Sequence, residues 1–261
     1  MRAAVKRQLA RLPDAGPARG ATLLVYHRVG AAVPDELDTP TAAFAAQLDV
    51  LDAYDVVSLD VALDRLDAGD ERPTTVITFD DGFADVHANA WPQLRERALP
   101  FTVYLAAGLL GGPMRWEGST SSSTGAALSW DQVEEMVASG LCTAANHTWS
   151  HARPDGLDAS QLDRCSDEVE RRLGCRPRHF AYTWGIEVPH ARVALRDRFR
   201  SAATGRPGRN LSGCDRLALA RVPVRGTDPI EFYAAKLRGS LRAERAYDAL
   251  VRAAKRAGAR A

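Results

Sequence analysis

Short apolar runs alternate along the chain with longer segments in which apolar residues recur at helical spacing. Eight runs are expected to form strands, at residues 22–26, 56–59, 75–79, 101–105, 141–145, 179–182, 200–203 and 217–224. Six segments are expected to form helices, at residues 41–54, 61–68, 88–97, 130–139, 160–173 and 190–198. This repeated order is typical of parallel strands joined by crossover helices. Because no glycine-rich nucleotide fingerprint is present, we predict an α/β fold, a distorted (β/α) barrel of about seven parallel strands, rather than an open sheet.

The chain shows no convincing linker and no internal repeat, so we expect its 261 residues to form a single domain, 1–261, with a core over about 22–237. Residues 111–125 are rich in Gly, Ser and Thr and lie between a predicted strand and a predicted helix. A long loop at such a place is more often the rim of an active site than a domain boundary. Residues 243–261 are expected to form a terminal helix.

Charge and cysteine content exclude several classes of partner. The 34 Lys and Arg residues balance 33 Asp and Glu residues, which gives no broad field for nucleic acid. The four cysteines lack C-x-x-C spacing, so we expect free thiols. No apolar run of about 18 residues predicts a transmembrane helix. Residues 1–12 lack the apolar stretch of a signal peptide. We therefore expect a cytoplasmic protein, with an amphipathic helix resting on a membrane surface as the alternative.

Two adjacent carboxylates end the predicted strand at 75–79, within the sequence Thr-Phe-Asp-Asp-Gly. Parallel barrels carry their chemistry at the carboxyl ends of the strands. A bend at Gly82 would let both Asp80 and Asp81 reach one cavity, although successive strand residues point to opposite faces. The alternative is a helix N-cap, for which a single Asp is sufficient. Two aspartates in succession after a buried strand favour the chemical interpretation.

A pair of histidines, His147 and His151, follows another predicted strand. Their spacing lets both imidazoles face one point if a helical turn begins there. Together with Asp81 they form a set of two nitrogens and one oxygen that leaves positions open for water and substrate. Asp80 is then a spare acid, so the set predicts a metal-assisted hydrolase. We expect one divalent metal, Zn²⁺, with Co²⁺, Ni²⁺ and Mn²⁺ as alternatives for the same ligands.

These two motifs, Thr-Phe-Asp-Asp-Gly and Asn-His-Thr-Trp-Ser-His, resemble the first two signature motifs of the polysaccharide deacetylase family, the family-4 carbohydrate esterases. The resemblance covers most of the chain, about 22–237. It implies a distorted barrel enzyme that removes acetyl groups from amino sugars with a divalent metal. The roles that it implies are a catalytic base, Asp80, and three metal ligands, Asp81, His147 and His151.

The chain departs from the family pattern in the group that protonates the leaving amine. Many relatives place a histidine in a Leu-x-His motif near the C-terminus, and here no histidine follows His190. Residues 23–29, Leu-Leu-Val-Tyr-His-Arg-Val, resemble the Tyr-His strand of a branch in which the motif order is circularly permuted. In a closed barrel the first and last strands are neighbours, so we assign the acid role to His27. The alternative is a histidine that is simply hydrogen-bonded at a strand end.

Three aromatic residues and one arginine complete the candidate site. Residues 179–185 resemble the family's Phe-Ala-Tyr-Pro-Tyr-Gly segment, with Tyr182 retained and Trp184 in place of the second Tyr. The Trp184 backbone N–H suits an oxyanion donor, because that role does not depend on the side chain. Trp149 is a candidate for stacking on a sugar face, with core packing as the alternative. Arg221 interrupts an apolar strand and is predicted to orient Asp80, with a surface ion pair as the alternative.

The sequence thus predicts hydrolytic removal of an acetyl group from an N-acetylated amino sugar or glycoconjugate. One alternative keeps the chemistry and changes the substrate to an amide or ester of a small cytoplasmic molecule or secondary metabolite. Another is a degenerate barrel that only binds carbohydrate. Its support is Thr183 and Trp184 in the altered 179–185 segment, together with the absent C-terminal histidine. The complete ligand set speaks against that second alternative.

Overall fold

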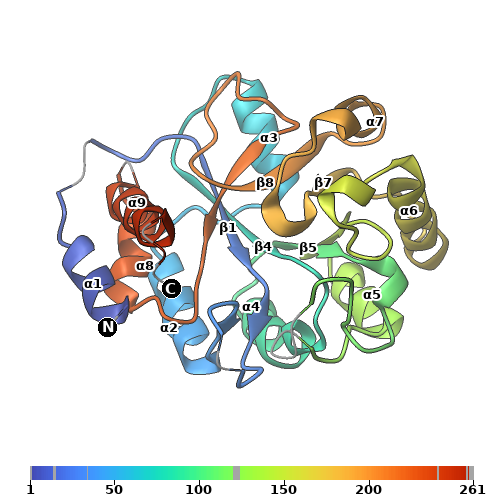
Figure 1. The fold of residues 1–261 in the computed structure, drawn as a ribbon, viewed down its shortest axis with the longest axis horizontal. Helices are drawn as coiled ribbons and strands as arrows, with labels where there is room; N and C mark the ends of the chain where they lie inside the picture. Colours follow the sequence, from blue (N-terminus) through green and yellow to red (C-terminus); the bar gives the residue numbers. More distant parts are fainter. Residues whose placement is uncertain are drawn as a thin grey trace.

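The structure is a computed structural model that describes residues 2–13, 16–33, 35–119, 124–239, 241–256 and 258. Seven parallel strands form a closed barrel at its centre, in the order β1-β4-β5-β6-β7-β8-β9, with β9 paired back to β1 (Figure 1). The barrel strands are β1 (Ala21–Tyr26), β4 (Thr74–Phe79), β5 (Phe101–Leu105), β6 (Cys142–Asn146), β7 (His179–Ala181), β8 (Ser201–Pro207) and β9 (Leu219–Pro223). A short parallel ribbon, β2 (Arg28–Val29) and β3 (Asp38–Thr39), follows β1. The predicted single-domain barrel of seven parallel strands is confirmed.

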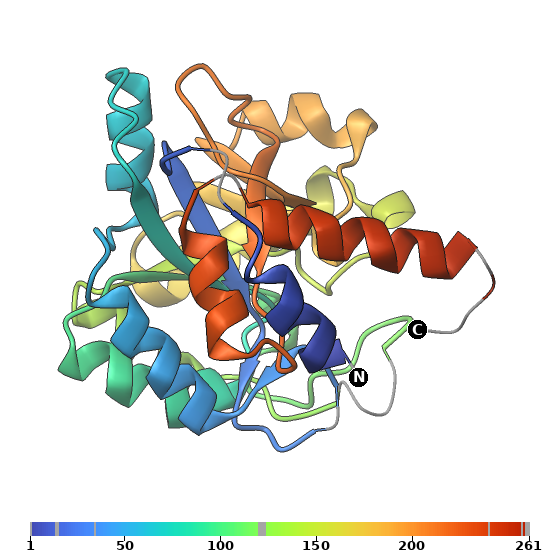
Figure 2. The ribbon, with the colours of Figure 1, turned by 90° about the vertical axis from the view of Figure 1, so that its left-hand side faces the viewer.

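Helices surround the barrel. The α-helices are α1 (Arg2–Leu9), α2 (Thr41–Leu51), α3 (Leu59–Asp67), α4 (Trp91–Glu96), α5 (Trp130–Ala138), α6 (Ala159–Leu173), α7 (Arg192–Arg196), α8 (Ile230–Leu237) and α9 (Arg242–Arg256). Shorter turns are the π-helical η1 (Val86–Ala90) and the 3₁₀ segments η2 (Ala107–Leu109), η4 (Pro154–Gly156), η5 (Thr183–Gly185) and η6 (Pro189–Ala191). Helices α1, α8 and α9 lie together on one side of the barrel (Figure 1, Figure 2).

Local sequence explains where several of these helices begin and end. Ser129 and Gln132 form a reciprocal capping box at the start of α5. Asp158 caps α6 by accepting a hydrogen bond from the Gln161 backbone N–H, and Gly174 ends that helix in the left-handed conformation. These caps satisfy backbone groups that the helix itself leaves unpaired.

The barrel interior is narrow and filled by side chains. One buried cluster contains at least one residue of every barrel strand, because alternate residues of each strand point into the barrel. These residues are Leu23, Val76, Tyr104, Ala145, Ala181, Ala203 and Leu219. The same cluster includes four apolar residues of α3, which are Leu59, Ala62, Leu63 and Leu66. Helix α3 therefore covers one end of the barrel interior.

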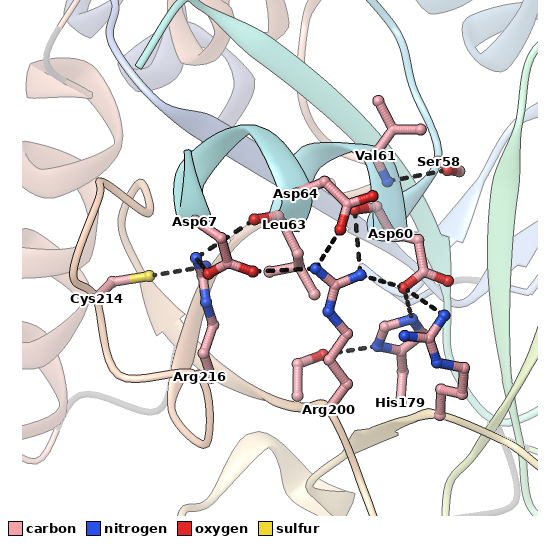
Figure 3. A network of polar contacts seen from close by, with 12 residues as sticks. Ser58, Asp60, Val61, Leu63, Asp64, Asp67, His179, Arg200, Cys214 and Arg216 are labelled. Atoms are coloured by element: carbon pink, nitrogen blue, oxygen red, sulfur yellow. Dashed lines mark hydrogen bonds and ion pairs between the residues drawn. The ribbon is translucent and has the colours of Figure 1, made fainter. Parts of the chain in front are cut away.

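Ion pairs fix α3 to the amino-terminal ends of three barrel strands (Figure 3). Arg200, just before β8, contacts Asp60 at 2.6 Å and Asp64 at 2.5 Å. Arg216, shortly before β9, contacts Asp67 at 2.6 Å. His179, the first residue of β7, places its Nε2 3.4 Å from Asp60. Because these partners all lie at the amino-terminal ends of their strands, the carboxyl-terminal end of the barrel is left for the site.

The predicted strand at 56–59 is wrong. Only a single bridge joins Val56 to Thr75, and α3 begins at Leu59. The side chain of Ser58 accepts a hydrogen bond from the Val61 backbone N–H, so it caps a helix where the apolar run indicated a strand. Among the described residues, α1, α8 and the β2–β3 ribbon also lay outside the predicted elements.

The predicted helix bounds are shifted at several ends. The predicted helix at 41–54 ends earlier, at Leu51, and the one at 190–198 is reduced to α7 after a 3₁₀ turn. The predicted helix at 88–97 is a π-helical turn followed by α4, with a proline in the first turn of α4. The helix predicted at 243–261 corresponds to α9, which ends at Arg256, and residues 257 and 259–261 lie outside the described part of the chain. The four cysteines are free thiols, as predicted. In the described part of the chain, we find no helix with the length and apolar character needed to cross a bilayer.

Candidate active site

Asp80 and Asp81 leave the carboxyl end of β4 and enter the same cavity. Asp80 continues the inward-facing alternation of the strand, and its backbone N–H donates to the Tyr26 carbonyl at 3.0 Å. The chain then bends, because Asp81 adopts a left-handed backbone with φ of 74° and Gly82 follows with φ of 91°. The bend thus begins one residue before the predicted Gly82. It brings two successive carboxylates, both buried, to one point.

His147 and His151 approach Asp81 from the loop after β6. Their Nε2 atoms lie 3.2 and 3.3 Å from Asp81 Oδ1. The helical turn considered from their spacing is absent from this described segment, since Thr148 has φ of 67° and His151 has φ of 54°. The Asn146 side chain accepts a hydrogen bond from the Thr148 backbone N–H, and it donates to the Leu162 carbonyl of α6. The strained loop is therefore held in place by its surroundings.

This set of three residues fits a divalent metal. One ligand atom from each of Asp81, His147 and His151 lies within 4.8 Å of the others. Two imidazole nitrogens and one carboxylate oxygen suit zinc, and three protein ligands leave room for further ones. His147 Nδ1 lies 2.9 Å from the Ala181 carbonyl, which makes Nδ1 a donor and turns Nε2 toward Asp81, where Nε2 can ligate a metal once it has lost its proton. His151 Nδ1 is buried and has no partner among the described residues.

Arg221 of β9 holds Asp80 through a bidentate pair. Its Nη1 and Nη2 donate to the two carboxylate oxygens at 2.6 and 2.7 Å. Its Nε donates to the Thr204 carbonyl at 2.9 Å, where β8 breaks register with β9. Both side chains of the pair are almost fully buried. The structure thus places Arg221 where the sequence predicted it, and not at the surface.

Both carboxyl groups are kept ionised by their neighbours. Burial alone would raise the pKa of Asp80, but the charges of Arg221 and His147 outweigh burial and lower that pKa below 3.8. For Asp81, hydrogen bonds from His147 and His151 overcome burial and hold the pKa well below 3.8. Ionised carboxylates are what a metal ligand and a general base require.

His27 lies in the same cavity, at the end of β1. The cavity has a volume of about 340 Å³, and its lining includes His27, Asp80, Asp81, His147, His151 and Arg221. His27 Nδ1 is buried and has no hydrogen-bond partner among the described residues. The alternative of a histidine that is merely hydrogen-bonded at a strand end finds no support at that nitrogen. The structure thus brings His27 together with the two motifs.

Two tryptophans form one wall of the cavity. Trp116, from the loop predicted to form a rim, stacks near His151 with 4.2 Å between ring centroids. The centroid of the Trp184 ring lies 5.5 Å from that of the same His151 ring, and Trp184 remains 43% exposed. Trp184 adopts φ of 61°, a strained conformation for a bulky residue. An exposed indole in a strained backbone at a cavity rim is a candidate for ligand contact.

The structure places two predicted substrate-binding residues outside the cavity lining. The hydroxyl of Tyr182 donates to the Leu217 carbonyl at 3.1 Å, and its ring packs against Phe180. Trp149 packs against the core and lies under the Arg164 guanidinium, 4.4 Å away. Both side chains are used in packing, which was the stated alternative for Trp149. The expectation that Tyr182 and Trp149 contact substrate is therefore not supported by their positions.

Sequence reasoning missed the opposite wall of the cavity. Leu37 and Pro223 line it beside His27. Neither residue carries a chemical signal in the sequence, because a single apolar residue in a loop (Leu37) or at the end of a strand (Pro223) has no recognisable spacing. The close approach of Gly185 to Gly205 was also missed, although a Cβ on Gly185 would lie 2.8 Å from the Gly205 Cα.

Comparisons with known proteins agree with this geometry. The sequence profile described as polysaccharide deacetylase matches residues 67–197. A solved structure of IcaB from Ammonifex degensii is similar at 31% identity and a TM-score of 0.72, over 84% of this chain and 97% of that chain. A search of curated proteins gave no match. The chain belongs to the polysaccharide deacetylase family, and its barrel is that of a family of deacetylating hydrolases.

Two more distant structures share the fold. A polysaccharide deacetylase from Bacillus cereus is 22% identical with a TM-score of 0.70, over 85% of this chain and 69% of that chain. A de-N-acetylase from Aggregatibacter actinomycetemcomitans is 22% identical with a TM-score of 0.62, over 80% of this chain and 96% of that chain.

Proposed function

We propose that the protein is a metal-dependent N-deacetylase that removes an acetyl group from an acetylated amino sugar or glycoconjugate. The observation that carries this proposal is the convergence of Asp81, His147 and His151 beside the Asp80–Arg221 pair. A ligand set alone would suit a structural site. A buried, ionised carboxylate next to it, held in a fixed orientation and facing an open cavity, suits hydrolysis.

The metal would be held by Asp81, His147 and His151, and when bound it supplies Lewis acidity toward the amide carbonyl. Zinc fits these ligands, and cobalt, nickel or manganese are compatible with them. Asp80 accepts the proton of the attacking water, and Arg221 keeps that carboxylate oriented. The Trp184 backbone N–H is assigned to the developing oxyanion.

His27 is assigned the role of the acid that protonates the leaving amine. It lies across the cavity from the ligand histidines, at the end of β1, and β1 pairs directly with the last strand, β9. We therefore assign to His27 the role that the resemblance gives to the Leu-x-His histidine of many relatives. This position of His27 supports the assignment of the chain to a circularly permuted branch.

The experiment that tests the proposal measures acetate release from N-acetylated monosaccharides and short oligomers. Metal-stripped protein is assayed with and without added Zn²⁺. Release that requires zinc and disappears in Asp80→Asn is expected. His147→Ala should abolish both zinc binding and release, while His87→Ala, a partly exposed histidine paired with Glu135, should change neither. Zinc-independent release, or none with zinc bound, contradicts the proposal.

The cavity size favours a second candidate substrate, an amide or ester of a small molecule. A volume of about 340 Å³ lies at the lower end of the range for small-molecule sites. It suits one acetylated unit rather than several. Rates that are equal for a monomer and for its oligomers would favour the small-molecule substrate, and rates that rise with chain length would favour a polymer.

A further inference from the structure

We propose that Lys6, on the N-terminal helix α1, is a positioning residue for the cavity wall beside His27. This inference rests on the proposed function, because it assigns Lys6 a role in that reaction. Lys6 lies outside the segment 67–197 that matches the family profile. It contacts neither the ligand set nor the cavity itself, so it acts through other residues.

Lys6 is the centre of a buried polar cluster. Its side chain is fully buried, although lysine is almost never buried without a partner. Its Nζ lies 2.8 Å from Asp228 and donates to the Thr227 hydroxyl at 2.5 Å. The same ammonium lies 4.6 Å from the centre of the Tyr247 ring on α9. One side chain thus joins α1 to α9 and to the loop between β9 and α8.

The first arm of the cluster runs from Asp228 to the cavity. Asp228 also pairs with the buried Lys236 of α8. Lys236 donates to the Pro223 carbonyl at 2.5 Å. Pro223 lines the cavity and lies two residues after Arg221, the partner of Asp80. Lys6 and Lys236 therefore fix Asp228 from two sides, and Lys236 connects this pair to the end of β9.

The second arm runs through Thr227 to the ribbon beside His27. The Thr227 hydroxyl accepts from Lys6 and donates to Glu36 at 2.7 Å. The Glu36 carbonyl accepts from the Gly226 backbone N–H at 2.9 Å. Leu37, the next residue, lines the cavity. The two arms thus end on Pro223 and Leu37, which form the same wall.

The choice of charged groups supports a positioning role. Burying several charges costs more than packing apolar side chains of similar volume, so charge is a poor way merely to attach a helix. Paired charges do fix geometry, because each ammonium must meet its acceptors at set distances. The hydrogen bonds of this cluster end at Pro223 and at Glu36, the neighbour of Leu37, so the fixed geometry acts on residues that line the cavity.

The test compares Lys6→Met with Arg7→Met, its neighbour on the same helix. Arg7 is largely exposed, and its ion pair with Glu231 is long, with 3.9 Å between Nε and the carboxylate oxygen. Thr227→Val, which removes one link of the second arm with little change in volume, is the milder variant if Lys6→Met folds poorly. Lys6→Arg tests rescue by a retained charge. Each is assayed for acetate release and zinc binding at a temperature at which its circular dichroism shows full folding.

Lys6→Met is expected to lower kcat per folded molecule by about tenfold to a hundredfold, since small misplacements have such effects. The zinc affinity of Lys6→Met and the kinetics of Arg7→Met should stay at wild-type values. Thr227→Val should lose less activity than Lys6→Met, and Lys6→Arg should retain part of the activity that Lys6→Met loses. Amide hydrogen exchange of residues 224–228 and 36–38 should rise in Lys6→Met. This readout needs no activity and separates this inference from the proposed function. Unchanged exchange and kcat in both Lys6→Met and Thr227→Val would overturn it.

Discussion

Arg221 and Asp80 lie 141 positions apart in the chain and share two parallel hydrogen bonds of 2.6 and 2.7 Å. One residue belongs to the last barrel strand and the other follows β4. The pair is buried, so each charge depends on the other for compensation. The orientation of the proposed base is thus set by a strand that does not neighbour its own.

Arg221→Lys tests the bidentate geometry while it keeps the charge. A single ammonium cannot reproduce the planar fork, so Asp80 should lose its fixed orientation. We expect kcat/KM to fall about a hundredfold with zinc binding retained. Steady-state kinetics and calorimetric zinc titration check this outcome. Arg206→Lys, an arginine of the neighbouring strand that donates to the Ala218 carbonyl, is the control and should keep wild-type kinetics.

His27→Gln tests the proposed acid through the choice of leaving group. Amide hydrolysis needs a proton on the departing amine, so its kcat should fall by about 10²- to 10⁴-fold. An aryl acetate ester has a leaving group that needs no proton, so its hydrolysis should change little. Asp80→Asn should lose both activities. Equal loss of amide and ester hydrolysis in His27→Gln would remove its role as the acid.

Trp184→Ala and Tyr182→Phe distinguish a residue that contacts substrate from one that packs in the core. Removing the half-exposed indole should raise KM about tenfold, because apolar contact with the substrate is lost. Removing the Tyr182 hydroxyl deletes its bond to Leu217 and should lower the free energy of unfolding by about 1 kcal/mol with KM unchanged. Denaturant unfolding and steady-state kinetics on both variants check these outcomes. A raised KM in Tyr182→Phe would restore its sequence-based assignment.

Asp60 gives a prediction about pH and stability. The His179 imidazole is the main cause that holds the Asp60 pKa well below 3.8, and Arg200 and Arg178 act in the same direction. A carboxyl group with a lowered pKa in the folded state stabilises the fold above its unfolded pKa, and this contribution is lost as the pH falls below about 4. Asp60→Asn should therefore lower the free energy of unfolding by about 1 kcal/mol at pH 7. Denaturant unfolding should show that difference shrinking toward pH 3, and a constant difference would contradict it.

The barrel, the convergence of Asp81, His147 and His151, and the Asp80–Arg221 pair could be predicted because each leaves a local signal. Strand runs repeat, and Arg221 stands out as a charge within an apolar strand. Trp184 was identified differently, because it replaces the second Tyr of the family segment that residues 179–185 resemble. The predicted strand at 56–59 failed because a short apolar run reads alike in a strand and before a helix, and Ser58 decided between them.

Other features depend on tertiary contacts that leave no sequence signal. Asp81 and His151 reach the cavity through left-handed backbone conformations, which are unexpected for non-glycine residues. Tyr182 and Trp149 are aromatic residues of the kind that can stack on a sugar, yet contacts with neighbouring residues turn both side chains into the packed interior. Lys6 reads as a surface lysine on a short helix, and only the folded chain brings Asp228 to it.

The closure of one barrel end by α3 has a consequence for product release. Apolar side chains from every strand and from α3 fill the space beneath the site. In the proposed reaction, substrate and both products therefore enter and leave through the open side of the cavity, whose lining includes Trp184 and Leu37. Accumulated acetate should then slow the proposed reaction, because acetate would occupy the cavity that the next substrate has to enter.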